Sequence, residues 1–316
     1  MEKFICEANY LQDMQNVALP YITERRTDEQ VSSFDSNPIH IASFKADEPH
    51  GTVVVVHGYT ESIEKYHEVI YYLLVSGYNV IIYEQRGHGT SYRAVEDKTL
   101  THIDSFDEYV LDLETVVKHA KEGSELPTYL LAHSMGGAVA ALYLEKHPDD
   151  FAKAVLLSPM IAPSTNGVPA GITKLIARAA ILFGKSKKRV FVMQPYPGKE
   201  HFEDSCASSQ ARFDYYEAIK STHEDFQNYS ASYRWLLESL KVTKKILKKG
   251  EVEKITSPVL MVQATDDTTV LLVPQNEFAK RLPNGKVIYA LCKHETFRAH
   301  DEVWHKLLDD ILEFLA

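Results

Sequence analysis

The sequence predicts an α/β fold with a mostly parallel central sheet, helices on both faces, and an inserted, mainly helical cap. Short runs rich in Val, Ile and Leu alternate with longer amphipathic stretches, the order typical of parallel sheets with right-handed crossovers. These runs lack apolar/polar alternation, as expected for strands covered on both faces. After Leu157 the next such run begins only at Val259, a gap too long for a connecting loop.

Each buried strand is expected where such an apolar run occurs. The predicted parallel strands are Thr52–Val56, Val80–Tyr83, Tyr129–Ala132, Ala154–Leu157, Val259–Val262 and Lys286–Tyr289. Ahead of them, Tyr21–Phe34 and Ile39–Phe44 alternate more strictly between apolar and polar residues. That pattern predicts an antiparallel hairpin at the entry to the sheet.

Helices are expected between the strands, where apolar residues recur at spacings of three and four. The predicted helices are Lys65–Ser76, Ser105–Lys121, Gly136–Lys146, Val273–Arg281 and Asp301–Leu315. The long gap is aromatic-rich, with Pro and Gly clusters and helix-like pieces at 171–183, 208–219 and 230–249. We interpret it as a cap inserted over the carboxyl edge of the sheet.

The predicted domain organisation follows from this insertion. Residues 1–159 form the first part of the core, residues 160–228 form the cap, and residues 229–316 form the second part of the core.

The overall charge argues against a nucleic-acid partner. The 316 residues include 34 Lys and Arg and 44 Asp and Glu, a formal net charge of −10, whereas nucleic-acid-binding domains are more often basic. The basic runs Lys185–Arg189 and Lys241–Lys249 are interpreted as solvated faces. A transient contact of the cap with a membrane surface is left open.

The cysteines favour a reducing compartment. Cys6, Cys206 and Cys292 are few, odd in number and widely spaced, so we expect neither a disulfide framework nor a metal site. The first residues carry acids where a signal peptide needs an apolar run, and no stretch approaches the length of a membrane-spanning helix. We therefore expect a cytoplasmic protein; the sequence does not indicate its oligomeric state.

A nucleophile motif stands between a predicted strand and a predicted helix. The stretch AHSMG, Ala132 to Gly136, matches the pattern G-x-S-x-G except that Ala132 replaces the first glycine. In that pattern the serine lies on a tight strand-to-helix turn at the sheet edge. Alanine adds one methyl group, which we expect the packing to accept, so Ser134 is the predicted nucleophile.

A serine nucleophile needs a histidine base and an orienting acid, in the chain order Ser, Asp or Glu, His. The loop after the Val259 strand offers Asp266 and Asp267. The loop after the last strand offers His294, which is therefore the predicted base. His300 and His305 fall on or near the final helix and are less suitable.

The oxyanion of an acyl-transfer intermediate needs backbone N–H donors. One is expected from Met135, which follows the nucleophile, and the other from Tyr59, in the loop HGYTES after the first parallel strand. His57, in the same loop, precedes the serine in the chain, whereas the base is expected to follow it. We interpret His57 as a residue that positions the loop.

Five stretches in this order, HGYTES, EQRGHGTS, AHSMGG, ATDDTTV and KHE, carry a family resemblance. The sequence resembles the α/β-hydrolase branch that contains bacterial lysophospholipases and monoacylglycerol lipases, also called serine aminopeptidase hydrolases, over nearly the whole chain. In the cap, RVFVMQPYPG followed by SSQARFDYY is most similar to the bacterial lysophospholipases. The resemblance implies an α/β-hydrolase fold.

The resemblance also assigns roles to individual residues. Aligning Ala264 and Val270 with the family's loop pattern G-x-x-D-x-x-V makes Asp267 the acid. The other roles that carry over are the nucleophile Ser134, the base His294 and the oxyanion donors Tyr59 and Met135.

The departures from the family pattern are Ala132 and Ala264 in place of glycines and Glu84 in place of aspartate. None of them removes a reacting group. The turn Gly87–Ser91, together with Arg86, is expected to support the fold.

The leading hypothesis is a serine carboxylester hydrolase that releases fatty acid from a small-molecule lipid ester, a lysophospholipid or a monoacylglycerol, through an acyl-enzyme and without cofactor or metal. An aminopeptidase or a short-chain esterase on the same scaffold is the alternative. A peptidase needs cap acids for a free amine, and Glu200, Glu203 and Asp204 are the candidates. A non-catalytic ligand-binding protein is disfavoured by the complete Ser, Asp and His set. Cys292 is expected to be a buried structural thiol.

Overall fold

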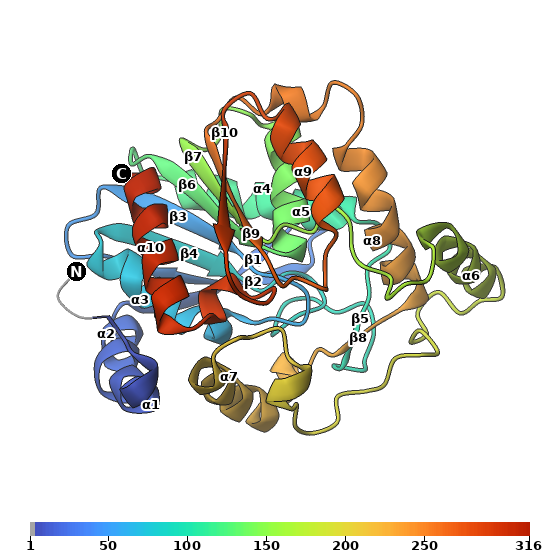
Figure 1. The fold of residues 1–316 in the computed structure, drawn as a ribbon, viewed down its shortest axis with the longest axis horizontal. Helices are drawn as coiled ribbons and strands as arrows, with labels where there is room; N and C mark the ends of the chain where they lie inside the picture. The colour runs from blue at the N-terminus through green and yellow to red at the C-terminus, as the bar shows by residue number, and fades with distance from the viewer. Residues whose placement is uncertain (1–3) are drawn as a thin grey trace.

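An eight-stranded sheet forms the centre of the computed structural model, which describes residues 4–316 (Figure 1). The strand order is β1-β2-β4-β3-β6-β7-β9-β10, antiparallel at β1, β2 and β4 and parallel from β4 onward. The strands are β1 (Arg26–Ser32), β2 (Pro38–Phe44), β3 (Gly51–Val56), β4 (Tyr78–Tyr83), β6 (Thr128–His133), β7 (Lys153–Leu157), β9 (Val259–Ala264) and β10 (Gly285–Ala290). The predicted parallel strands are confirmed.

Helices cover both faces of the sheet, which explains the uninterrupted apolar runs. In β3, Val54 and Val56 pack into the core that includes α4 and α5, while Val53 and Val55 pack into the core that includes α3 and α10. The covering helices are α3 (His67–Val75), α4 (Asp107–Lys121), α5 (Met135–Lys146), α9 (Leu272–Arg281) and α10 (Asp301–Leu315). A strand with water on one face would not tolerate valine at every position.

The entry to the sheet differs from the prediction. Residues 21–24 belong to α2 (Leu19–Glu24), which follows η1 (Glu7–Asn9), α1 (Tyr10–Asp13) and η2 (Met14–Ala18), so the hairpin starts only at β1. The buried residues of this helical segment recur every fourth position. They are Tyr10, Met14, Ala18 and Ile22, one face of a helix. That four-residue spacing is the signal that could have predicted a helical segment before β1.

The insertion between β7 and β9 is mainly helical, as predicted. It contains α6 (Ala170–Leu182), η4 (Phe202–Asp204), α7 (Gln210–Thr222), η5 (Glu224–Phe226), β8 (Ser230–Ala231), α8 (Tyr233–Ile246) and η6 (Val252–Lys254). Helix α6 packs on α8, and β8 pairs in parallel with β5 (Leu100–Thr101) (Figure 1). The boundaries of the cap at residues 160 and 228 stay a prediction.

The turn after β4 is held by buried charge. Arg86 donates to both carboxylate oxygens of Asp112, at 2.6 and 2.7 Å, and to Asp35 at 3.0 Å. These contacts tie the turn to α4 and to the β1–β2 hairpin, in keeping with its predicted structural role. Among residues 4–316, no helix has the length and apolar character needed to cross a bilayer.

Candidate active site

Ser134 lies on a sharp turn between β6 and α5. Its φ is 52° and its ψ −116°, a conformation that non-glycine residues rarely adopt. The Ser134 N–H donates to Leu157 O at 3.0 Å, and its carbonyl oxygen accepts from Met160 N–H at 2.8 Å. These bonds fix the strained turn at the carboxyl edge of the sheet, where the hydroxyl faces the loops that follow β9 and β10.

Small residues around Ser134 let the helix approach the sheet. A Cβ atom on Gly136 would lie 2.2 Å from the carbonyl oxygen of Val56, so no other residue fits there. Ala132 is fully buried, and its methyl group is part of the core. The fold therefore accepts alanine at the first position of the motif but requires glycine at the fifth.

The structure brings the three predicted reacting side chains together. The Oγ of Ser134 lies 2.7 Å from Nε2 of His294, and Nδ1 of His294 lies 2.6 Å from Oδ2 of Asp267. Asp266, the other acid that the chemistry alone left open, is exposed, and its carboxylate accepts from Thr265 at 3.5 Å. Of the two adjacent acids, Asp267 is the one that contacts the histidine.

The environment of Asp267 keeps its carboxylate ionised. Its Oδ1 accepts the backbone N–H groups of Thr269 at 2.8 Å and Val270 at 3.1 Å. Burial alone would raise the pKa of Asp267, but the hydrogen bond and charge of His294, with the two N–H donors, lower this pKa below its usual value. An ionised carboxylate can orient the imidazole through Nδ1–H and stabilise its cation.

Two backbone N–H groups near the turn remain open. Among residues 4–316, we find no acceptor for the N–H of Met135 or for that of Tyr59. Met135 opens the twelve-residue helix α5, so its N–H is at the positive end of the helix dipole. Tyr59 follows β3, and its ring stacks on Trp235 of α8 at 4.2 Å. Both groups suit a developing oxyanion.

His57 takes the positioning role predicted for it. It is fully buried, and burial lowers its pKa to about 4, so the ring is neutral. Its Nε2 accepts the N–H of Gln85 at 2.9 Å, and its Nδ1 lies 2.7 Å from the carbonyl oxygen of Gly58. The neutral imidazole thus joins the loops after β3 and β4.

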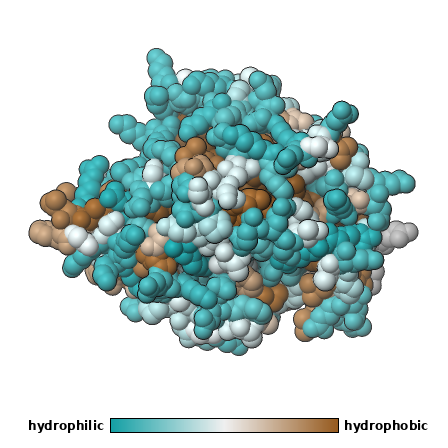
Figure 2. All heavy atoms as spheres, turned by 180° about the vertical axis from the view of Figure 1, so that it is seen from behind, coloured by the Kyte–Doolittle hydropathy of each residue, from teal (hydrophilic) through white to brown (hydrophobic). Residues whose placement is uncertain are grey.

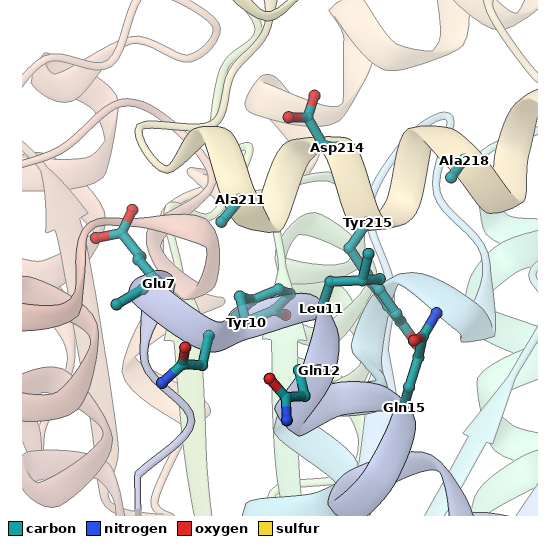
Figure 3. A pocket seen from close by; sticks show the side chains of 11 residues that line it. Glu7, Tyr10, Leu11, Gln12, Gln15, Ala211, Asp214, Tyr215 and Ala218 are labelled. Carbon is teal, nitrogen blue, oxygen red and sulfur yellow. The ribbon is translucent and has the colours of Figure 1, made fainter.

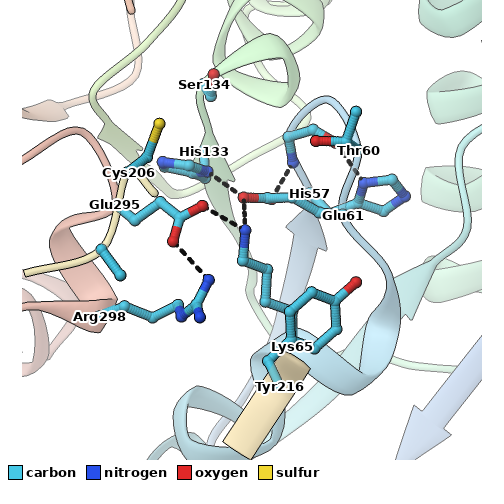
Figure 4. Close-up of polar contacts among 12 residues, drawn as sticks. His57, Thr60, Glu61, Lys65, His133, Ser134, Cys206, Tyr216, Glu295 and Arg298 are labelled. Atoms are coloured by element: carbon cyan, nitrogen blue, oxygen red, sulfur yellow. Dashed lines mark hydrogen bonds and ion pairs between the residues drawn. The ribbon is translucent and has the colours of Figure 1, made fainter. Parts of the chain in front are cut away.

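A buried carboxylate that the sequence reasoning did not single out joins the same loop to the serine turn (Figure 4). Oε2 of Glu61 accepts the N–H of Gly58 at 2.5 Å and the hydroxyl of Tyr66 at 2.6 Å. Its Oε1 lies 3.0 Å from Nδ1 of His133, the residue before Ser134. Burial would raise the pKa of Glu61, but Lys65 and His133 hold it well below its usual range.

The ion network continues to the histidine loop. Lys65 bridges Glu61 at 3.0 Å and Glu295 at 2.5 Å, and Glu295 also accepts from Arg298 at 2.6 Å. Glu295 directly follows His294. The four-residue spacing of Glu61 and Lys65 was the available local signal. Glu295, 230 positions from Lys65, had none.

The two other candidate histidines make contacts with the N-terminal segment. His300 contacts Glu7, and His305 lies 3.1 Å from the carbonyl oxygen of Ile5. Cys292 is buried, and burial raises the pKa of its thiol to about 12, so it stays protonated, as expected of a structural thiol.

Two hollows flank α7. An open groove of about 540 Å³ lies between α7 and the N-terminal helical segment, lined by Tyr10, Leu11 and Tyr215 among others, and includes none of the three reacting residues (Figure 3). A smaller cavity of about 120 Å³ is lined by Thr60, Cys206 and Glu295, among others. It borders the loops that carry Tyr59 and His294.

The fold and this constellation define the chain as an α/β-hydrolase and a serine hydrolase. A family model described as "Serine aminopeptidase, S33" matches residues 47–310, and the chain belongs to this family. The predicted family and fold are thereby confirmed.

Related proteins share much of the chain. Lysophospholipase L2 of Escherichia coli K12 is 27% identical over 264 residues, covering 78% of this chain and 72% of that protein. Monoacylglycerol lipase of Mycolicibacterium smegmatis is 30% identical over 139 residues, covering 44% of this chain and 46% of that protein.

Solved structures share the fold. A soluble variant of monoglyceride lipase from Saccharomyces cerevisiae aligns with a TM-score of 0.71 at 19% identity, covering 92% of this chain and 95% of that one. A thermostable carboxyl esterase from Bacillus coagulans aligns with a TM-score of 0.73 at 18% identity, covering 92% and 98%.

Proposed function

We propose that this chain hydrolyses the carboxylic ester of single-chain lipids, lysophospholipids or monoacylglycerols, through Ser134, His294 and Asp267. The observation that carries the proposal is the unbroken chain of contacts from Oγ of Ser134 through both ring nitrogens of His294 to an ionised carboxylate. The names of the relatives supply the substrate class.

The mechanism follows from the contacts. His294 accepts the proton of Ser134 while Oγ attacks the ester carbonyl, and the oxyanion is held by the N–H groups of Tyr59 and Met135. The imidazolium, stabilised by Asp267, then gives its proton to the departing alcohol. Water activated by His294 attacks the acyl-enzyme and releases the fatty acid. No step needs a cofactor or a metal.

The proposal includes contact of the cap with an anionic membrane surface. The α6 surface consists of the exposed side chains Ile172, Leu175, Ile176, Leu182, Phe183, Phe191 and Val192. Leu182 is 84% exposed and Phe183 78%, and brown atoms gather at the left tip of Figure 2, where the turned view brings α6. Exposed apolar clusters of this kind mark interaction sites.

The charge of the segment around the α6 surface indicates which kind of partner that surface would bind. Residues 160–199 contain no Asp or Glu, although the whole chain has a net charge of −10. The same segment carries Lys174, Arg178, Lys185, Lys187, Lys188, Arg189 and Lys199. An apolar surface flanked by cations suits the interface of an anionic bilayer. The cytoplasmic location stays part of the proposal.

The aminopeptidase alternative has weaker support. Of its three candidate acids, Glu200 pairs with Lys220, and Glu203 does not line the cavity beside the reacting residues. Asp204 lines that cavity, but Lys65 and Arg298 line it as well. A site for a free amine alone has no need of these cations.

The first test is intact-mass analysis after a fluorophosphonate probe, with fatty-acid release from lysophosphatidylcholine and monoacylglycerol. We expect one adduct on the wild type, none on Ser134→Ala, and fatty-acid release lower in the variant by about 10⁴-fold or more. Labelling with release only from short-chain esters or aminoacyl arylamides would move the assignment to the alternatives. Full lipid turnover by Ser134→Ala would contradict the mechanism.

The adjacent acids Asp266 and Asp267 provide a matched pair of variants. Asp267→Asn is expected to lower kcat by about 10³- to 10⁴-fold, because it favours the wrong tautomer of His294. Asp266→Asn, one residue away and exposed, is expected to stay within about twofold, because a surface substitution of this kind leaves the contacts of His294 intact. Similar losses in both variants would remove Asp267 from its role.

A further inference from the structure

Glu61 is a buried carboxylate on which four polar groups converge. They are the N–H of Gly58, the hydroxyl of Tyr66, the ammonium of Lys65 and Nδ1 of His133, at distances from 2.5 to 3.0 Å. A carboxylate offers about four acceptor positions and has no proton to donate. Because Glu61 is only 3% exposed, these four groups together fill its acceptor capacity.

The contact with Gly58 fixes the loop that carries the Tyr59 N–H. Oε2 of Glu61 accepts the N–H of Gly58 at 2.5 Å. The carbonyl oxygen of Gly58 accepts from Nδ1 of His57 at 2.7 Å, since Nε2 of that ring already accepts the N–H of Gln85. The carbonyl of Gly58 and the N–H of Tyr59 belong to one planar peptide and point in opposite directions. Gly58 is therefore held at both its N–H and its carbonyl, which sets the direction of the Tyr59 N–H.

The contact with His133 leads from Glu61 to the base (Figure 4). Nδ1 of His133 lies 3.0 Å from Oε1 of Glu61, and Nε2 lies 3.3 Å from the carbonyl oxygen of His294. The ring is buried, directly precedes Ser134 in the chain, and packs edge to face on Phe297 at 5.1 Å between ring centroids. One side chain therefore joins the carboxylate of Glu61 to the backbone of His294.

A second buried carboxylate, Glu68, has the same number of contacts but different partners. It accepts one hydrogen bond from Tyr10, one from Trp304 and two from Arg212, at distances from 2.8 to 3.1 Å. These partners belong to α1, α10 and α7 and not to the loops that carry the reacting groups. The two carboxylates thus do similar work for the fold, and Glu61 differs in that its contacts lead to the active site.

We propose that Glu61 is a positioning residue for ester hydrolysis, which fixes the oxyanion N–H of Tyr59 relative to the base His294. Geometry of this kind matters because a displacement of about 1 Å in a catalytic site costs about 10²-fold in rate. The loss of one oxyanion donor costs about 10²- to 10³-fold in kcat. The inference rests on the proposed function, because it assumes that the reaction takes place at Ser134.

The test is the variant Glu61→Gln, measured on a short, water-soluble ester. An amide has the shape of the carboxylate but carries two N–H donors, which must face two of the four groups around it. The contact with Gly58 or the contact with His133 is then lost. We expect kcat and kcat/KM to fall together by about 10²-fold, with KM within about twofold of the wild type, because the oxyanion contact forms only in the transition state.

The matched control is Glu68→Gln, which places the same amide among four donors elsewhere in the core. Both variants should have a lower Tm than the wild type, because each leaves buried donors without an acceptor. At a temperature below both transitions, Glu68→Gln should keep kcat within about twofold of the wild type. Thermal unfolding followed by circular dichroism gives the Tm values and shows that each variant is folded in the assay.

A second variant tests the link to the base and does not depend on the folding of Glu61→Gln. His133→Phe keeps a ring beside Phe297 but removes both nitrogens. We expect kcat to fall by about tenfold or more with KM within about twofold. The double variant should lose no more activity than Glu61→Gln alone, because substitutions that act through one link are not additive.

The outcomes separate this inference from the proposed function. A folded Glu61→Gln variant that keeps the kcat of Glu68→Gln overturns the positioning role and leaves the ester hydrolase intact. Wild-type kcat in His133→Phe does the same, and so does a rise in KM alone in either variant. A wild type that hydrolyses no ester and takes no fluorophosphonate label at Ser134 overturns the proposed function, and the positioning role with it.

Discussion

Helices α6 and α7 belong to the same insertion and have thirteen residues each, yet they meet the rest of the molecule in opposite ways. In α7 six residues are buried, including the charged side chains Arg212, Glu217 and Lys220. In α6, all of which is described, Ala177 alone is buried, and leucine and isoleucine side chains face outward. One helix buries its charges and the other exposes its apolar residues.

The difference lies in the partners available to each helix. Arg212 of α7 donates to Glu68 of α3 at 2.8 and 2.9 Å and to Asp301 of α10 at 2.9 Å, so its charge is matched inside the protein. Helix α6 packs on α8, and among residues 4–316 we find no second apolar layer over its outer face. These ion pairs hold α7 in place, whereas the outer face of α6 stays exposed and is the face that the proposed membrane contact would cover.

The largest expected effect is the loss of stability when the buried ion pair between α7 and α3 is removed. Arg212→Met should lower the free energy of unfolding by about 3–5 kcal/mol, because it leaves Glu68 buried without its cation. Arg178→Met on α6 is the control and should stay within about 0.5 kcal/mol, since that side chain is exposed. Urea denaturation measures both, and equal losses would contradict the contrast between the helices.

The next effect concerns the apolar side chains of the α6 surface. Leu182→Ser with Phe183→Ser should weaken binding to anionic vesicles by about tenfold or more, since each side chain contributes about 1.5–3 kcal/mol when fully buried. Leu11→Ser, an exposed leucine on α1, is the control. Cosedimentation with phosphatidylglycerol vesicles gives the affinities; unchanged binding by the double variant would remove α6 from the membrane contact.

A smaller effect tests the charge of the same surface. Lys188→Gln should weaken binding to anionic vesicles about fivefold, because one cation near such a surface contributes about 1 kcal/mol. The loss should shrink at high salt, where screening shortens the range of the attraction. Lys280→Gln on α9, also exposed, is the matched control. Equal losses in the two variants would indicate a general charge effect rather than docking through α6.

The smallest expected effect separates docking from chemistry. With a short, water-soluble ester, the Leu182→Ser and Phe183→Ser double variant should keep its kcat/KM within about twofold of the wild type, as for exposed positions away from the site. Its activity on lipid in anionic vesicles should fall together with its binding. A parallel loss on the soluble ester would mean that α6 shapes the site itself.

The sequence by itself determined the sheet and the order of the reacting residues. Runs such as TVVVV are stable only when both faces are covered, so they predict parallel strands between helix layers. The carboxyl ends of parallel strands meet at one edge, and the structure brings Ser134, Asp267 and His294 within hydrogen-bond distance there. Chemistry alone left Asp266 and Asp267 open; the family resemblance selected Asp267.

The tertiary structure decided which charges and which apolar faces are buried. Glu295 and Lys65 are 230 positions apart, and Arg212 meets Glu68 across 144, so no local pattern announces these pairs. A charge can be buried only where a distant partner offsets its desolvation, and a helix face is covered only where the fold supplies a neighbour. For this reason the cavity beneath α7 and the exposed face of α6 became visible only in three dimensions.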